Sequence, residues 1–239
     1  MATQYTYSTI ALPSPLTTKT PPPNLADLAE RYAAIRLEAL QAAPHAFASS
    51  FALESQLTPE QWAAKVWRDD IVLLICLARP VGSNDDSEEL WAGSAVLRGP
   101  LSATDYAFPP ESKFPALRSD AEETRWQMTA VYTSTAHRGH GLGGMLIQAA
   151  KDYAARFSGQ RTVRLRAVVH PDNLVAVVVY TRTGFRDVAR TTGKEAYRTN
   201  GDVADWTRKL ASLTSDEERA RWTELLIAVV LEWVSEAEL

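Results

Sequence analysis

The stretch AHRGHGLGGML, residues 136–146, holds Gly139, Gly141, Gly143 and Gly144 between an apolar segment and a helical pattern. Glycine has no Cβ atom, so a glycine-rich backbone can approach a ligand closely and direct several N–H groups at one anion. The dipole of a helix that begins there adds a favourable potential for negative charge. The stretch therefore predicts a phosphate-binding loop at a helix N-terminus.

Two common nucleotide-binding loops fit this stretch poorly. A P-loop needs Gly-Lys-Ser/Thr, which is missing. Gly139-x-Gly141-x-x-Gly144 matches the Rossmann pattern, but the following segment VRLRAVVH does not end in an acidic residue that could hold a ribose. Arg164 and Arg166 in that segment could favour a 2′-phosphate instead. Because the motif comes late in the chain, too little sequence remains for a doubly wound sheet, and a Rossmann oxidoreductase is the distant alternative.

A third pattern, Arg138-x-x-Gly141-x-Gly143, overlaps the same residues. A downstream block, HPDNLVAVVVYTRTGF, carries Asn173, Ala176, Tyr180, Gly184 and Phe185. Together the two patterns resemble the paired motifs of the GCN5-related N-acetyltransferase (GNAT) family, over about residues 25–210. One departure is Thr135, which stands where many members have proline before the first motif.

The resemblance implies an α/β fold of the GNAT acyl-CoA N-acyltransferase type, with a mixed, mostly antiparallel sheet flanked by helices. It implies acetyl-CoA as the acyl donor, no metal, and direct attack of an acceptor amine on the thioester in a ternary complex. The strand residues Val131 and Thr133 would offer backbone groups to pantetheine, and Asn173 would contact the cofactor. The expected loop contacts are Arg138, Gly139, His140, Gly141, Leu142, Gly143 and Gly144.

Asn173 and Tyr180 are seven residues apart, so they share one face of a helix. In the family the corresponding tyrosine lies near the thioester sulfur. A tyrosine has a reference pKa of about 10, so its hydroxyl stays protonated at neutral pH and can donate to a thiolate. The resemblance thus implies that Tyr180 is the catalytic acid. The alternative is an ordinary core aromatic.

An alkylamine, with a pKa of about 10.4, arrives protonated and must lose a proton before it attacks. Glu54, Glu123 and His170 are candidate bases, and a water relay or the neutral fraction of the amine could replace them, so we assign no base. His137 and His140 flank Arg138 without a neighbouring cysteine or carboxylate, so we expect no zinc site.

The elements that must position these residues can be read from the hydrophobic pattern. Strands are expected at 5–11, 71–78, 90–99, 125–133 and 162–170, and a terminal strand pair at 185–191 and 203–210. We expect the second and third of these strands to pair across a polar turn at 79–89. Helices should begin after a cap at Asn24, after a Thr58–Gln61 capping box, and at residues 142 and 174. Residues 12–24 form a Pro-rich connector and residues 100–124 a long loop.

The C-terminal segment has a capping box of Ser215 and Glu218, followed by a wide apolar stripe. The stripe consists of Trp222, Leu225, Leu226, Val229, Val230 and Trp233. We therefore expect a GNAT acetyltransferase domain at 1–213 and an extra amphipathic C-terminal helix at 214–239. That helix would pack on the domain or on a partner chain, which makes a homodimer one option.

Composition limits the remaining classes of function. The net charge of −4, without a basic stripe, gives no reason to expect nucleic acid, and no leader or long apolar run indicates a membrane, so a cytoplasmic protein is expected. The prediction is an acetyl-CoA-dependent N-acetyltransferase that acts on a primary amine, either a small molecule or a peptide. A non-catalytic acyl-CoA-binding or regulatory module is the alternative. The acceptor and an acyl group other than acetyl stay open, and segments 45–60, 100–124 and 191–201 would select the acceptor.

Overall fold

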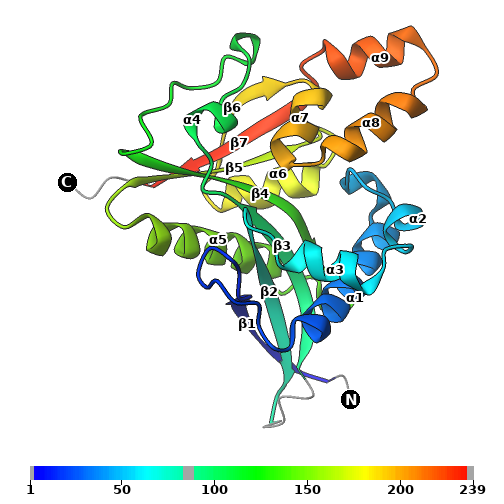
Figure 1. Ribbon diagram of the computed structural model, residues 1–239, viewed down its shortest axis with the longest axis vertical. Helices are drawn as coiled ribbons and strands as arrows, with labels where there is room; N and C mark the ends of the chain where they lie inside the picture. Colours follow the sequence, from blue (N-terminus) through cyan, green and yellow to red (C-terminus); the bar gives the residue numbers. More distant parts are fainter. Residues whose placement is uncertain (1–2, 83–88, 236–239) are drawn as a thin grey trace. The chain divides into compact units, whose positions relative to one another are not determined.

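The computed structural model describes residues 3–82 and 89–235. Part of the expected turn (83–88) and the last residues of the expected helix (236–239) therefore lie outside the described residues. The chain divides into two compact units (Figure 1). The first comprises Met1–Leu97 and Ala130–Tyr153, and the second comprises Arg98–Thr129 and Ala154–Leu239.

The first unit contains β1 (Tyr5–Ala11), β2 (Ile71–Pro80), β3 (Leu90–Arg98) and the end of β4 (Glu123–Thr133). Strand β1 pairs antiparallel with β2, with Tyr5 opposite Pro80 and Ala11 opposite Leu74. Every residue from 71 to 78 in β2 is buried. A strand covered on both faces reads as a continuous apolar run, which explains the segment IVLLICLA.

Helices cover both faces of β2. Side chains of α1 (Leu25–Ala42) and α3 (Pro59–Val66) form one core with Leu73, Ile75 and Leu77. On the other face, Leu146 of α5 (Leu142–Ser158) packs so closely that a Cβ atom at Gly93 would lie 3.3 Å from its side chain. The remaining short helices of this unit are η1 (Pro44–Ala46), α2 (Phe51–Glu54) and η4 (Thr135–His137).

The two predicted N-caps have different outcomes. The capping box is confirmed, because Thr58 accepts the backbone N–H of Gln61 while the Gln61 side chain accepts that of Thr58. Asn24 stands at the predicted position before α1, but its side chain makes no capping hydrogen bond, so that expected cap is wrong. The Asn24 backbone carbonyl instead accepts the N–H of Leu28 at 3.1 Å.

The second unit is built on β4, β5 (Thr162–Val169), β7 (Ala228–Val234) and β6 (Arg186–Thr191). Strand β5 runs parallel to β4 and antiparallel to β7, which in turn pairs antiparallel with β6. The hydrogen-bonded order is β1-β2-β3-β4-β5-β7-β6, so β4 belongs to both units. The predicted α/β class and mostly antiparallel sheet of GNAT type are confirmed.

The C-terminal segment differs from the sequence prediction. Helix α9 (Asp216–Thr223) ends early, and Ala228–Val234 is a strand between β5 and β6, so the helix expected at 214–239 is wrong over its second half. Val229, Val230 and Val234 are β-branched and favour an extended backbone. The segment is therefore part of the sheet and not an appended helix.

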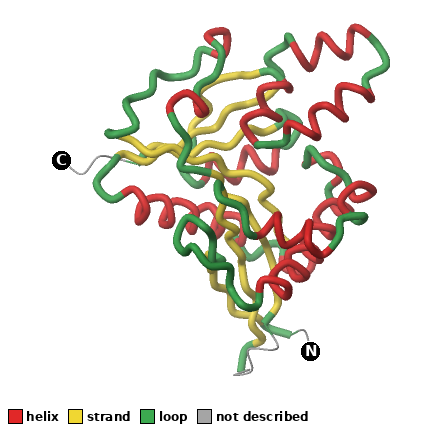
Figure 2. Tube along the Cα trace, in the orientation of Figure 1, coloured by secondary structure: helices red, strands yellow, loops and turns green. Residues whose placement is uncertain are grey.

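The strand pair that was predicted between residues 185–191 and 203–210 is also wrong. Residues 203–210 lie in α8 (Val203–Ser212), so β6 takes β7 as its partner. Along the sequence, helices α7 (Gly193–Asn200), α8 and α9 follow β6 and precede β7. Figure 2 shows helices in red and strands in yellow. The rings of Tyr197 and Trp206 are 5.5 Å apart, and this packing of α8 on α7 overrides the weak strand pattern. Helix α6 (Leu174–Arg182) was predicted correctly.

The long loop at 100–124 is bound to the sheet by arginine side chains. It contains α4 (Ala103–Tyr106) and η3 (Pro110–Ser112), and its last two residues begin β4. Arg125 donates to the carbonyl of Arg118, Arg164 to that of Ala116, and Arg166 to that of Tyr106. Glu123 and Glu232 bind Arg164 in turn. Arg164 and Arg166 are thus structural, which removes the suggested 2′-phosphate contact.

The strand assignment of β7 predicts a strong difference between two valines in it. Val230 is fully buried and Val234 is 40% exposed. Val230→Ala should lower the free energy of unfolding by about 2 kcal/mol through lost burial and a cavity. The control Val234→Ala should change it by less than about 0.5 kcal/mol. Urea denaturation measures both, and equal effects would contradict the assignment.

Candidate active site

The glycine-rich loop follows directly after strand β4. The chain passes through η4 and Arg138 and enters α5 at Leu142. Gly139 and Gly141 have left-handed backbones, with φ of +85° and +75°. A Cβ atom at either position would meet nothing within 4 Å. The backbone conformation therefore requires glycine here, and the space beside both residues is open.

The start of α5 leaves backbone donors available. The first hydrogen bond of the helix runs from the N–H of Met145 to the carbonyl of Gly141, at 3.1 Å. The N–H groups of Leu142, Gly143 and Gly144 precede it and have no acceptor within the helix. The Leu142 side chain is buried and anchors this end. Free amides, open space and the helix dipole together fit an anionic group such as a pyrophosphate.

The arginine and the two histidines at the loop contact different parts of the chain. Arg138 is exposed, and its Nε donates to the carbonyl of Thr133 at 3.4 Å. His137 is buried, with Nδ1 3.2 Å from the hydroxyl of Tyr7, and the ring of His140 lies 5.1 Å from the Tyr7 ring. Both histidines thus pack against β1. Within residues 3–82 and 89–235, no group of three or more His, Cys, Asp or Glu side chains could hold a metal ion.

Strand β4 is irregular just before the loop. Ala130 has a left-handed backbone, with φ of +52°, inside a strand. For a residue with a Cβ atom this conformation costs roughly 1–2 kcal/mol. Residues 129–131 are only half-buried, whereas residues 123–128 are buried. The irregularity directly precedes Val131, and an alanine in the sequence gives no signal for it.

Sequence reasoning missed Glu38, which lies on α1 beside the end of β4. One oxygen of its carboxylate accepts three hydrogen bonds, from the Tyr132 hydroxyl at 2.9 Å, the Ser134 hydroxyl at 2.8 Å and the Thr135 amide at 3.3 Å. Burial, and then Glu38, raise the pKa of Tyr132 to about 12. No local pattern could reveal contacts between residues more than 90 positions apart in the chain.

Asn173 and Tyr180 lie in the second unit, on helix α6. The Asn173 side chain caps the helix by accepting the N–H of Ala176 at 3.2 Å. Tyr180 is 4% exposed and packs on Phe185 with ring centres 5.0 Å apart, and burial raises the pKa of its hydroxyl above the usual 10. That hydroxyl makes no hydrogen bond to any residue in the described part of the chain, so it is available as a donor.

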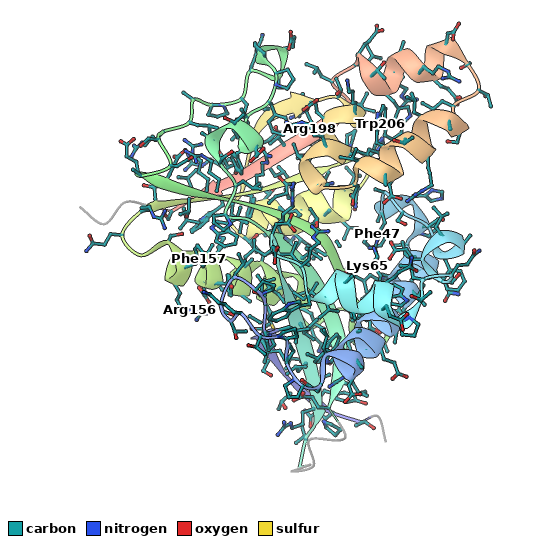
Figure 3. All side chains as sticks on the ribbon, in the orientation of Figure 1. Phe47, Lys65, Arg156, Phe157, Arg198 and Trp206 are labelled. Carbon is teal, nitrogen blue, oxygen red and sulfur yellow. The ribbon has the colours of Figure 1, made fainter. Side chains whose placement is uncertain are left out.

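Two of the three candidate bases are held in ion pairs. Glu54 accepts Arg36 at 2.7 Å and lies 3.5 Å from Lys65, which is labelled in Figure 3. Glu123 is buried and bound by Arg125 and Arg164, with nitrogen–oxygen distances of 2.8 Å to both. The lowered pKa of Glu54 makes it a weak proton acceptor, and both carboxylate oxygens of Glu123 are engaged by arginines.

His170 is the third candidate, at the end of β5. Its side chain is 35% exposed, and its Nδ1 accepts the backbone N–H of Asp172 at 3.3 Å. The same Nδ1 lies 3.6 Å from the Asp172 carboxylate, so this nitrogen is occupied by contacts within its own turn. The geometry therefore favours none of the three as the base.

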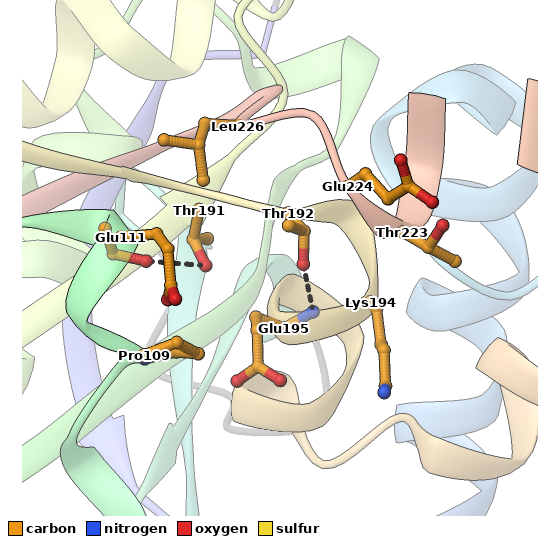
Figure 4. Close-up of a pocket in the computed structure, with 10 residues that line it drawn as sticks. Pro109, Glu111, Thr191, Thr192, Lys194, Glu195, Thr223, Glu224 and Leu226 are labelled. Carbon is orange, nitrogen blue, oxygen red and sulfur yellow. Dashed lines mark hydrogen bonds between the residues drawn. The ribbon is translucent and has the colours of Figure 1, made fainter. Parts of the chain in front are cut away.

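Each unit has a cavity that is lined by residues outside the glycine loop. A groove of about 620 Å³ runs between α1 and α3 over Trp62, and Asp27, Glu30 and Glu60 are its charged residues. A cavity of about 260 Å³ in the second unit opens between η3, the start of α7 and residues 223–226 (Figure 4). Its charged residues are Glu111, Lys194, Glu195 and Glu224.

Comparison with known families gives this geometry a context. Residues 101–185, which include both the glycine loop and α6, match the model of the acetyltransferase (GNAT) family. The resemblance to the GNAT family is confirmed. No curated protein matches the sequence. Among the described residues, no helix is long and apolar enough to cross a membrane.

Known structures share the GNAT fold at low sequence identity. Arabidopsis thaliana NAA60 in complex with acetyl-CoA has a TM-score of 0.53 at 16% identity, with 96% of this chain and 98% of that chain covered. The same protein with a bisubstrate analogue gives 0.50 at 15%, covering 96% and 100%. A putative acetyltransferase from Acinetobacter baylyi gives 0.52 at 13%, covering 98% and 96%.

The ion pair of Glu54 predicts a pH-dependent contribution to stability. Burial alone would raise the pKa of Glu54, but the hydrogen bond and charge of Arg36, with the charge of Lys65, lower it below the usual 4.5. A lowered folded-state pKa gives stability that is present above pH 4.5 and is lost as the pH falls through the folded-state pKa. Glu54→Gln should therefore destabilise the fold by about 2 kcal/mol or more at pH 7.

Denaturation of both proteins between pH 7 and pH 3 measures this contribution, and the difference in unfolding free energy should shrink below pH 4.5. A difference that stays constant down to pH 3 would contradict a stabilising carboxylate at this position.

Proposed function

We propose that this protein is an N-acetyltransferase that moves the acetyl group of acetyl-CoA to a primary amine. The observation that supports this most is the loop at the start of α5, where glycines with left-handed backbones precede three amides that lack helical acceptors. The GNAT family match covers this loop. Acetyl-CoA is bound to the structurally similar NAA60, which supports the same acyl donor here.

In the proposed complex the coenzyme A pyrophosphate binds the amides of the loop, and Arg138 and His140 lie beside the phosphates. The loop contacts are Arg138, Gly139, His140, Gly141, Leu142, Gly143 and Gly144. Val131 and Thr133 offer backbone groups to pantetheine, as the family resemblance implies. Asn173 contacts the cofactor through its amide nitrogen, since its oxygen already caps α6.

The proposed reaction needs no covalent enzyme intermediate. The neutral amine nitrogen attacks the thioester carbonyl, the C–S bond breaks, and the CoA thiolate leaves. Tyr180 donates its hydroxyl proton to that thiolate. The nitrogen loses a proton to water, and water returns a proton to the Tyr180 oxygen, so the acid is restored. Catalysis then comes from positioning and from stabilisation of the developing charge. The raised pKa of Tyr180 keeps the acid protonated throughout the neutral range.

The acceptor is proposed to be a protonated amine in solution, either a small molecule or a peptide. Two of the three segments expected to select it, 100–124 and 191–201, line the same cavity in the second unit. That lining has three glutamates and one lysine, and an excess of negative charge favours a cationic acceptor.

Acetyl-CoA should stabilise the native state by about 2.7 kcal/mol when it is present at 100 times its dissociation constant. NADPH should not, because the Rossmann alternative lacks structural support. Gly143→Val should abolish the shift, since a β-branched side chain fills the phosphate position. Thermal melting with each ligand measures the effect. A folded Gly143→Val protein that keeps the full acetyl-CoA shift would remove this site assignment.

Tyr180→Phe should lower kcat by about 100-fold or more and leave the KM for acetyl-CoA nearly unchanged, because a general acid acts in the transition state. Steady-state kinetics with an accepted amine measures both values. The matched control is Phe185→Leu, which alters the packing beside Tyr180 but keeps the hydroxyl. A Phe variant that binds acetyl-CoA and keeps more than half the rate would make Tyr180 an ordinary core aromatic.

A further inference from the structure

We infer that Glu38 is a positioning residue for the acyl-CoA loop and that it acts through Tyr132 and the first residues of η4. The inference rests on the proposed function, because it takes the loop at 138–144 as the acyl-CoA site. Glu38 itself touches no reacting group. Its effect is to fix the point at which β4 ends and the loop begins.

The hydrogen bonds of Glu38 join three consecutive parts of the chain to one carboxylate. Tyr132 is the next-to-last residue of β4, Ser134 lies between β4 and η4, and Thr135 begins η4. All three donate to the same oxygen, at 2.8–3.3 Å. Bonds to a charged acceptor are stronger than bonds between neutral groups. Helix α1, which is not part of the loop, thus fixes the position of the end of β4.

The ring of Tyr132 also contacts a residue of the glycine loop and a residue of segment 45–60. It lies 5.9 Å from the Arg138 guanidinium and 6.5 Å from the ring of Phe47, which is labelled in Figure 3. Arg138 is the first residue of the loop motif. Phe47 belongs to segment 45–60, one of the segments that we expect to select the acceptor. The Glu38–Tyr132 hydrogen bond therefore holds a ring that touches both segments.

Loss of the hydrogen bonds to Glu38 should reduce the fraction of molecules whose loop can bind acyl-CoA. The left-handed glycines of the loop give it few preferences of its own, because glycine adopts many backbone conformations. If only a fraction of molecules keeps the competent arrangement, the apparent dissociation constant rises by the inverse of that fraction. The expected signature is weaker acyl-CoA binding and a more mobile loop, with the rest of the fold retained.

The test uses the full-length protein and two measurements, amide hydrogen exchange without ligand and the dissociation constant for coenzyme A by calorimetry. The variants are Glu38→Ala, Glu38→Gln and Tyr132→Phe. Glutamine keeps an acceptor oxygen and should partly rescue. Phenylalanine removes only the hydroxyl and keeps both ring contacts. The structural control is Ser215→Ala, which removes the N-cap hydrogen bond of α9 in the other unit.

Glu38→Ala should raise the dissociation constant about tenfold or more and speed exchange in residues 134–144 by a similar factor. Glu38→Gln should stay within about threefold of the wild type and Tyr132→Phe should lie between the two. Ser215→Ala should change melting but neither of these values. Unchanged exchange and affinity in a folded Glu38→Ala protein would overturn the inference.

Two further results remain decisive. If Glu38→Ala does not fold, Tyr132→Phe decides, and normal exchange in its loop overturns the inference. If the wild type does not bind coenzyme A, the proposed function fails. Hydrogen exchange without ligand still tests whether Glu38 orders residues 134–144.

Discussion

The hydrogen bonds accepted by the Glu38 carboxylate are the constraint on which the candidate site depends. They join α1 to the end of β4, and the glycine loop starts only a few residues later. A loop with left-handed glycines has little intrinsic order, so its entry point must be fixed by neighbouring elements. Leu142, buried at the start of α5, fixes its exit. Between these two points the first amides of the helix are left for an anion.

The two units stabilise their sheets by different physical means. In the first unit, α1 and α3 cover β2 with an almost wholly apolar core. In the second, Arg125, Arg164 and Arg166 on neighbouring strands bind the carbonyl groups of the long loop. Glu123 supplies the opposite charge for Arg125 and Arg164, and Glu232 adds a second one for Arg164. The Arg166 guanidinium lies instead over the rings of Tyr106 and Phe108. The ion pairs of Glu123 also remove it from consideration as a base.

The sequence predicted the features that depend on local chemistry. Glycines at positions with positive φ, the Thr58–Gln61 capping box and the apolar run of β2 each carry their signal within a few residues. The sequence pattern predicted a helix where the structure has strand β7. Large apolar residues at 225–233 fit both the 3.6-residue period of a helix and the two-residue period of a strand. Only pairing with β5 and β6 decides between the two. Glu38 and the arginines act across long sequence separations, and Ala130 looks like any alanine in a strand, so none of them could be recognised beforehand.

We propose that the protein transfers an acetyl group and does not merely bind its donor. The most direct measurement is release of free CoA thiol from acetyl-CoA in the presence of a broad set of primary amines, each compared with the rate of hydrolysis without amine. At least one amine should raise thiol release well above hydrolysis, and mass spectrometry should find one added acetyl group on that amine. Tight acetyl-CoA binding with no amine-dependent release would contradict acetyl transfer and would favour a non-catalytic acyl-CoA-binding module.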